Sequence, residues 1–173
     1  LPVSALDYYL AIAYALGCEP ESPRMQLATV EADERAADAA WRGLGLDARE
    51  PVVLLNSSGA YGAAKLWPDE HFAGLARRIV ADLDHSVVVI CGPDDRRRAA
   101  DIAARAAHPR VSSLAARSPG IGLTKACVRR ARCLVSTDSG PLHVAAAFGV
   151  PVVAIFGPTD PAWSETYFER EVK

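Results

Sequence analysis

From residue 51 onward, short runs of apolar, mostly β-branched residues alternate with longer segments that carry a helical pattern of apolar residues. Such alternation is typical of proteins in which each strand is followed by a helix that crosses over the sheet. The runs are continuously apolar rather than alternately polar, so we expect helices on both faces and a parallel sheet. Five runs are present, at residues 52–56, 87–91, 111–114, 134–136 and 152–156.

The segments between these runs predict four helices, at residues 68–82, 94–107, 123–131 and 141–148. With right-handed crossovers, the predicted fold is an α/β, Rossmann-like, doubly wound parallel sheet with strand order 3-2-1-4-5. In such an open sheet, ligands bind beyond the carboxyl ends of the strands where the order reverses, here between the first and fourth strands.

The first 50 residues have a different character. An apolar helix is expected at 5–16, a linker rich in Pro and Glu at 18–28, and an alanine-rich amphipathic helix at 31–44. The first helix has a wide apolar stripe with nothing to cover it, so the chain is expected to be a fragment of a longer protein. We interpret 1–50 as an interdomain helix and linker, and 51–173 as a ligand-binding domain.

The overall charge argues against several kinds of partner. Half of the 173 residues are hydrophobic, and the net charge is −2, which gives no basic surface for nucleic acid or for anionic membranes. No apolar run approaches the roughly 18 residues of a membrane span, and no signal peptide is recognisable. We therefore expect a cytoplasmic protein with no nucleic-acid partner and at most peripheral membrane contact.

Two unusual loops are expected to meet at the point where the strand order reverses. The first, residues 56–65, contains Ser57, Ser58, Gly59 and Gly62, and ends at Lys65. Small residues allow backbone and hydroxyl donors to approach a diphosphate closely, and a lysine supplies a point charge for its oxygens. The alternative is a flexible surface loop with a solvated lysine.

The second loop, residues 136–141, leads into a helix in which Pro141 suits the first turn. The free N–H groups and the positive end of the helix dipole favour an anion there, above all a phosphate. Asp138 either caps this helix or accepts hydrogen bonds from a sugar hydroxyl beside the phosphates. His143, one turn further on, is either a core histidine or a donor to the same ligand.

Charged residues also follow the second strand. An acidic residue at this place often binds ribose hydroxyls, which makes Asp94 and Asp95 candidates, although Asp94 is also a suitable helix cap. The adjacent Arg96, Arg97 and Arg98 are interpreted as a solvated helix face.

Other signals are weak or argue against a class. Gly59 and Gly62 do not form a GxGxxG fingerprint, which argues against an NAD-dependent oxidoreductase. Asp82 and Asp84 have the spacing of a metal-binding carboxylate pair. They precede the second strand, however, and so are expected at the edge of the sheet away from the site. The cysteines have no metal-ligand spacing, and those at 91, 127 and 133 are interpreted as reduced core residues. We predict no cofactor and no metal.

The second loop and the strand after it, residues 136–161 beginning Ser-Thr-Asp-Ser-Gly-Pro-Leu-His, closely resemble glycosyltransferase family nine, the ADP-heptose:lipopolysaccharide heptosyltransferases. Residues 58–68 are similar to the family's other donor-site motif, in the style of heptosyltransferase II. Two motifs in the right order make the resemblance specific, and it covers residues 51–161 well.

The resemblance implies one half of a GT-B enzyme, in which two Rossmann-like domains face each other across a cleft. Such enzymes transfer heptose from ADP-heptose to the lipopolysaccharide core with inversion and without a required metal. This sequence resembles the C-terminal, donor-binding half. The family's catalytic base lies in the N-terminal domain, which is not in this chain, so the chain alone is expected to be inactive.

The resemblance also assigns roles by motif. Lys65 would hold the diphosphate and stabilise the leaving group, Asp138 would hold heptose hydroxyls, and adenine would lie near residues 115–123. The remaining donor contacts would be Ser57 and Ser58 to the diphosphate, Ser139 and Gly140 from the helix start, and Asp94 or Asp95 to the ribose. The alternative function is a nucleotide-binding regulatory module without transferase activity.

Overall fold

The computed structural model of the chain describes residues 3–47, 49–59 and 63–173. Its centre is one parallel sheet, and the apolar runs of the sequence form its strands. The strands are β1 (Val52–Asn56), β2 (Ser86–Ile90), β3 (Val111–Ser113), β4 (Cys133–Thr137), β5 (Val152–Ile155) and β6 (Glu171–Val172). They lie side by side in the order β3-β2-β1-β4-β5-β6. The predicted doubly wound fold and the order of its first five strands are therefore confirmed.

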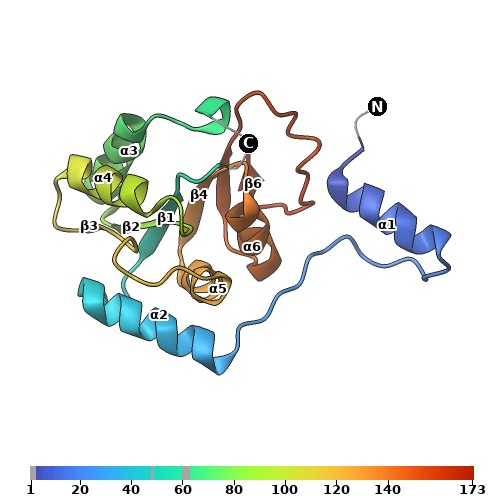
Figure 1. The fold of residues 1–173 in the computed structure, drawn as a ribbon, viewed down its shortest axis with the longest axis horizontal. Helices are drawn as coiled ribbons and strands as arrows, with labels where there is room; N and C mark the ends of the chain where they lie inside the picture. The colour runs from blue at the N-terminus through green and yellow to red at the C-terminus, as the bar shows by residue number, and fades with distance from the viewer. Residues whose placement is uncertain (1–2, 48, 60–62) are drawn as a thin grey trace.

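Helices cover both faces of this sheet, as Figure 1 shows. The helices are α1 (Ala5–Ala15), α2 (Glu31–Leu44), α3 (Asp69–Leu83), α4 (Arg96–Ala106), α5 (Ile121–Arg130) and α6 (Gly140–Phe148). One apolar core lies under α3 and α4 and includes Phe72 and Ile102, while the other lies under α2, α5 and α6 and includes Trp41 and Leu142. The central strands β1 and β2 are buried along their whole length, which explains their continuous apolar composition.

The sixth strand was not predicted. β6 has two residues, and it pairs in parallel with β5 through Val152 opposite Glu171 and Val153 opposite Val172. So short a strand leaves no apolar run in the sequence. Because β5 and β6 are parallel, residues 156–170 must return from the carboxyl edge of the sheet to its amino edge. This return segment begins at the edge where the two predicted loops lie.

The helix starts settle two alternatives for capping. α4 begins at Arg96 with Asp95 at its N-cap position, and α6 begins at Gly140 with Ser139 there, in neither case with a side-chain capping bond. Helix capping by Asp94 or Asp138 is therefore wrong. α6 ends at Phe148, as predicted, and Gly149 follows at its C-cap with a φ of +70°, in the left-handed region that glycine adopts without strain.

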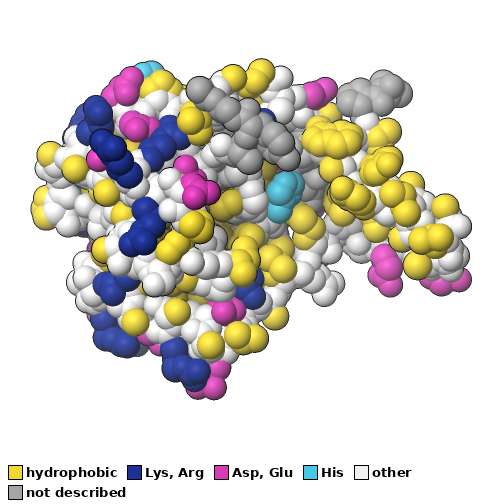
Figure 2. Space-filling view, viewed as in Figure 1, with side chains coloured by type: hydrophobic (Ala, Val, Ile, Leu, Met, Phe, Trp, Pro, Cys, Tyr) yellow, Lys and Arg dark blue, Asp and Glu magenta, His cyan; other side chains and the backbone are white. Residues whose placement is uncertain are grey.

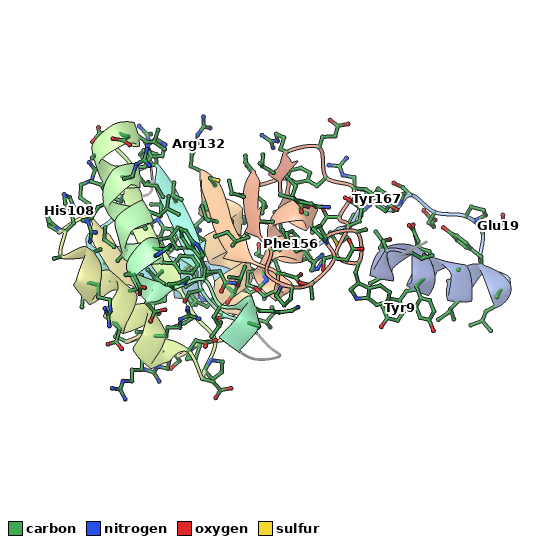
Figure 3. The ribbon with its side chains drawn as sticks, turned by 90° about the horizontal axis from the view of Figure 1, so that it is seen from above. Tyr9, Glu19, His108, Arg132, Phe156 and Tyr167 are labelled. Atoms are coloured by element: carbon green, nitrogen blue, oxygen red, sulfur yellow. The ribbon has the colours of Figure 1, made fainter. Side chains whose placement is uncertain are left out.

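The helix α1 stands apart from the sheet and its layers (Figures 1 and 3). It is held at its N-terminal end, where the Ala5 N–H donates to the Trp163 carbonyl at 2.9 Å and the Tyr167 hydroxyl contacts the Asp7 carboxylate. None of its residues is buried, and Figure 2 shows hydrophobic side chains gathered over it. Much of the apolar stripe expected from the sequence is thus exposed in the described part of the chain, while Leu6 and Leu10 are half-buried.

Ion pairs attach α2 to α5. The Glu34 carboxylate lies 2.6 Å from Arg130 Nη2, and Lys125 Nζ lies 3.1 Å from Asp33 Oδ2. A hydrogen bond from Thr29, assisted by the neighbouring arginines, outweighs burial and lowers the pKa of Glu34 from 4.5 to about 2. The carboxylate is therefore ionised over most of the pH range in which proteins fold.

Candidate donor site

The carboxyl ends of β1 and β4 bring the two predicted loops together. The buried Asn56 amide, at the end of β1, donates to Ser136 Oγ at 3.0 Å and to Ser139 Oγ at 2.7 Å. The Thr137 hydroxyl, at the end of β4, donates to the Ser58 carbonyl. Side chains of each strand end therefore fix the loop that follows the other, and the predicted meeting of the loops is confirmed.

A pocket of about 590 Å³ opens at this edge of the sheet. The N-terminal ends of α4, α5 and α6 all border it, and helix N-termini present unpaired N–H groups that favour an anion. Six predicted site residues line it: Ser58, Gly59, Asp94, Asp95, Ser139 and Gly140. Gly120 and Ile121, from the region predicted to contact adenine, line the pocket as well. The volume lies in the range typical of small-molecule sites.

Beside the pocket, Lys65 and Asp138 form an ion pair. Lys65 Nζ lies 2.8 Å from Asp138 Oδ2, and the two side chains are 15% and 9% exposed. Asp138 also accepts hydrogen bonds from Thr159 Oγ1 at 2.9 Å and from Ser164 Oγ at 2.7 Å. Burial raises the pKa of Asp138, but the bonds from Lys65, Ser164 and Thr159 outweigh it and hold the pKa below its usual value. The carboxylate is ionised at neutral pH.

Two hydroxyls of the first loop are buried without a hydrogen-bond partner among the described residues. These are Ser57 Oγ and Ser58 Oγ. An unsatisfied buried hydroxyl costs about 1–3 kcal/mol, so such groups call for a partner beyond the described residues, which a ligand could supply. Ser58 lines the pocket and is placed for this, whereas Ser57 is fully buried behind the lining. Gly62, the fourth small residue of the prediction, lies outside the described residues.

His143 is half-buried on α6 and does not line the pocket. Burial lowers its pKa, although the charges of Asp138 and Glu171 act in the opposite direction. The imidazole is therefore neutral at pH 7. Its contact with a ligand stays a prediction.

The interpretation of three arginines as one solvated face is wrong for Arg98. Its side chain is 16% exposed and pairs with Asp69, whereas that of Arg97 is 95% exposed, as predicted. Arg98 lies one helical turn before the fully buried Ile102, so it belongs to the inward face of α4. The helical period of the buried residues was the signal that could have identified it.

Thr159 and Ser164 were missed for a different reason. Both belong to the return segment after β5, and their hydroxyls reach Asp138 because that segment begins at the same edge of the sheet. A hydroxyl residue in a loop carries little information by itself. The available signal was that the loop follows a strand next to β4.

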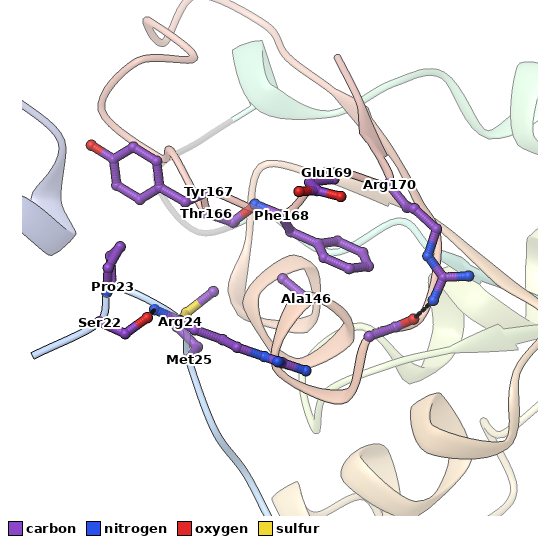
Figure 4. A pocket seen from close by; sticks show the side chains of 11 residues that line it. Ser22, Pro23, Arg24, Met25, Ala146, Thr166, Tyr167, Phe168, Glu169 and Arg170 are labelled. Atoms are coloured by element: carbon purple, nitrogen blue, oxygen red, sulfur yellow. Dashed lines mark hydrogen bonds between the residues drawn. The ribbon is translucent and has the colours of Figure 1, made fainter.

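A second pocket, of about 400 Å³, lies away from the predicted site residues, none of which lines it. Figure 4 shows that it is formed by the linker at residues 22–25, the end of α6 and residues 166–170. The Arg170 guanidinium lies 5.7 Å from the centroid of the Phe168 ring and donates to the Gly149 carbonyl. These contacts join the C-terminal segment to the end of α6.

Three further observations concern the described residues as a whole. They contain no group of three or more His, Cys, Asp or Glu side chains arranged to hold a metal ion. None of their helices combines the length and apolar composition needed to cross a membrane. Cys91 and Cys127 are buried free thiols, as predicted, and burial raises the pKa of Cys127 to about 12.

The comparisons with known proteins agree on one family. The model of "Glycosyltransferase family 9 (heptosyltransferase)" matches residues 5–172. Lipopolysaccharide heptosyltransferase 2 of Salmonella typhimurium is 26% identical over 167 residues, which are 90% of this chain and 46% of that protein. The chain thus spans about half the length of the curated relatives that it matches.

Solved structures show the same relation. A family 9 glycosyl transferase from Veillonella parvula superimposes with a TM-score of 0.84 at 25% identity, over 99% of this chain and 49% of that one. The Escherichia coli heptosyltransferase WaaC with ADP superimposes with a TM-score of 0.62 at 28% identity, over 79% of this chain and 41% of that one. WaaC has also been solved with ADP-2-deoxy-2-fluoro heptose, with a TM-score of 0.60 at 28% identity over 79% of this chain and 40% of that one.

Proposed function

The chain belongs to glycosyltransferase family 9, and from this premise we propose that it forms the ADP-heptose-binding part of a heptosyltransferase. The observation that carries the proposal is the meeting of the two loops. They line one pocket of about 590 Å³ together, and Lys65 of the first lies 2.8 Å from Asp138 of the second beside it. A nucleotide sugar needs adjoining subsites of different chemistry, and the pocket and the ion pair beside it would supply them.

The pocket suits a nucleoside diphosphate. We assign the phosphates to the N-terminus of α6, where Ser139 and Gly140 present backbone N–H groups, and to the Ser58 hydroxyl. Asp94 and Asp95 both border the same pocket, and one or the other would accept hydrogen bonds from the ribose hydroxyls. The base would lie against the start of α5 at Gly120 and Ile121. The phosphate and ribose assignments each give a polar group of the ligand a partner of matching chemistry.

Lys65 and Asp138 would act at the sugar end. When the bond between the anomeric carbon and the phosphate oxygen breaks, negative charge grows on the departing ADP. The Lys65 ammonium and the α6 N-terminus would stabilise that charge, which is the task a metal ion performs in other transferases. Asp138 is ionised and holds Lys65 in place, and it would accept hydrogen bonds from heptose hydroxyls.

The rest of the reaction belongs to the proposal as well. We assign residues 1–50 to an interdomain helix and linker, and residues 51–173 to the donor domain. An additional domain would bind the lipopolysaccharide acceptor and contribute the catalytic base, since the relatives are about twice as long as the matched region. The transfer would invert the anomeric centre and need no metal, and the protein would act in the cytoplasm.

Isothermal titration of the 173-residue chain with a set of nucleotides and nucleotide sugars tests this function. We expect ADP to bind, ADP-heptose to bind more tightly than ADP, and that gain to disappear in Asp138→Ala. Preference for UDP or GDP sugars would overturn the ADP assignment. Equal affinity for ADP and ADP-heptose in both forms would instead support a regulatory nucleotide-binding module.

A further inference from the structure

The loop that carries Lys65 depends on other parts of the fold for its shape. Apart from the 3-10 turn at Ala63–Lys65, its described residues between β1 and α3 belong to no helix or strand. Its carbonyl groups are held by side chains from elsewhere, among them the Thr137 hydroxyl on the Ser58 carbonyl. A loop without a backbone ladder keeps one conformation only where such contacts fix it.

Arg98 makes two of these contacts and also pairs with the first residue of α3. Its Nη1 donates to the Ser57 carbonyl at 2.6 Å, its Nη2 to the Trp67 carbonyl at 2.7 Å, and its Nε to Asp69 Oδ1 at 2.6 Å. Ser57 is the first residue after β1, and Trp67 lies two residues before α3 begins. A single guanidinium on α4 therefore joins the two ends of the loop.

The geometry of these contacts requires arginine. Its planar group presents five N–H donors in a fixed fork, while a lysine ammonium is a compact charge that cannot span the same three acceptors. The side chain is largely buried, and the carboxylate of Asp69 neutralises its charge. Arg98 does not line the pocket, so its influence on a ligand has to pass through the loop.

The far end of the loop is also anchored by packing. The Trp67 ring meets the ring of the fully buried Phe72 edge to face, with 4.9 Å between their centroids. Lys65 lies two residues before Trp67, so fixing the Trp67 backbone limits where the Lys65 ammonium can reach. In the structure it reaches Asp138 at 2.8 Å.

We propose that Arg98 is a positioning residue for the donor site: by joining the Ser57 and Trp67 carbonyls it holds the loop in the conformation that delivers Lys65 to Asp138 and to the diphosphate. The part concerning the diphosphate rests on the function proposed above. The part concerning the loop rests on this structure alone.

Two measurements on the 173-residue chain test the proposal, with Arg98→Lys as the variant and Arg97→Lys, one position earlier on the same helix, as the control. Hydrogen exchange of a peptide spanning residues 57–67 should be faster in Arg98→Lys, with sheet peptides unchanged, and should be normal in Arg97→Lys. ADP should bind about three- to tenfold more weakly to Arg98→Lys, since one charge-assisted contact is worth about tenfold or more.

A double-mutant cycle separates positioning from general destabilisation. If Arg98 acts through Lys65, Arg98→Lys should change ADP affinity by less than about twofold in a Lys65→Met background, because coupled residues are not additive. An equal loss in both backgrounds would refute the role. Should Arg98→Lys fail to fold, Asp69→Ala, which removes one of the three contacts, should still speed exchange in the loop.

The outcomes distinguish the two proposals. If wild-type protein binds no ADP but Arg98→Lys speeds loop exchange, the proposed function fails and the effect of Arg98 on the loop stands. If ADP binds and neither loop exchange nor ADP affinity changes in Arg98→Lys, the function stands and the positioning role is overturned.

Discussion

Replacing Lys65 with Met should weaken ADP binding more strongly than the loss of one contact. A charge-assisted hydrogen bond contributes about 1.5–3 kcal/mol, which corresponds to about tenfold to 100-fold in affinity. In addition, Lys65 Nζ neutralises Asp138 at 2.8 Å, and both side chains are largely buried. Without the ammonium, Asp138 would repel a diphosphate charge, by about 2 kcal/mol if their separation is taken as about 8 Å at an effective dielectric constant of about 20.

This reasoning makes a specific prediction for the double variant. Like Lys65→Met, the double variant Lys65→Met/Asp138→Asn lacks the attraction between the ammonium and the diphosphate. It also lacks the negative charge at position 138, so it should bind ADP at least about threefold more tightly than Lys65→Met alone. Isothermal titration with ADP, which lacks the heptose, avoids any effect of Asp138 on the sugar. The difference between the two variants should shrink as salt is added, because the repulsion is screened.

A matched control is available at an ion pair whose residues do not line the pocket. Lys125 forms an ion pair with Asp33 at 3.1 Å, and those side chains are 19% and 14% exposed, close to the values for Lys65 and Asp138. Lys125→Met should therefore destabilise the fold to a similar degree without changing ADP affinity. If Lys65→Met binds ADP within about threefold of wild type, or the double variant binds no better than the single one, the assigned role of Lys65 is refuted.

Three further perturbations test the fold around the site. Gly157→Ala should weaken ADP binding, because its Cβ would lie 2.6 Å from the Ala64 carbonyl oxygen beside Lys65, whereas Gly74→Ala, with 3.9 Å to its nearest neighbour, should not; titration compares them. The pKa of Glu34 is about 2 in the fold, below its ordinary 4.5, so stability present above pH 4.5 should be lost as pH falls towards 2. Urea unfolding should show a flatter dependence in Glu34→Gln over that window. Leu54→Ala, at a fully buried position in the central strand, should lower the free energy of unfolding by about 2–5 kcal/mol, measured by the same method.

The architecture could be predicted from the sequence because a strand that helices bury on both faces has a continuously apolar composition. Continuous apolar runs such as residues 52–55 of β1 occur where helices cover both faces, and parallel neighbours require connections long enough to hold a helix. The strand order then followed from the handedness of crossovers. The same logic brought Lys65 and Asp138 together, since parallel strands place their carboxyl ends at one edge.

Side-chain partners were decided by packing. Three consecutive arginines look alike in a sequence, yet only Arg98 is turned inward to hold the donor loop, because it shares the face of α4 that carries Ile102. By residue type, Asp138 was equally suited to cap a helix. In the structure its carboxylate instead accepts hydrogen bonds from Lys65 and from the hydroxyls of Thr159 and Ser164. Local propensity does not distinguish such uses.

The sequence by itself therefore determined the doubly wound sheet and the edge at which its two loops meet, because burial and chain direction leave a periodic pattern in the composition. Only the tertiary structure decided the two-residue strand β6 and the hydroxyls that reach Asp138 from the return segment after β5. These features depend on where a segment without periodicity is folded back, and that is set by contacts between residues distant in the chain.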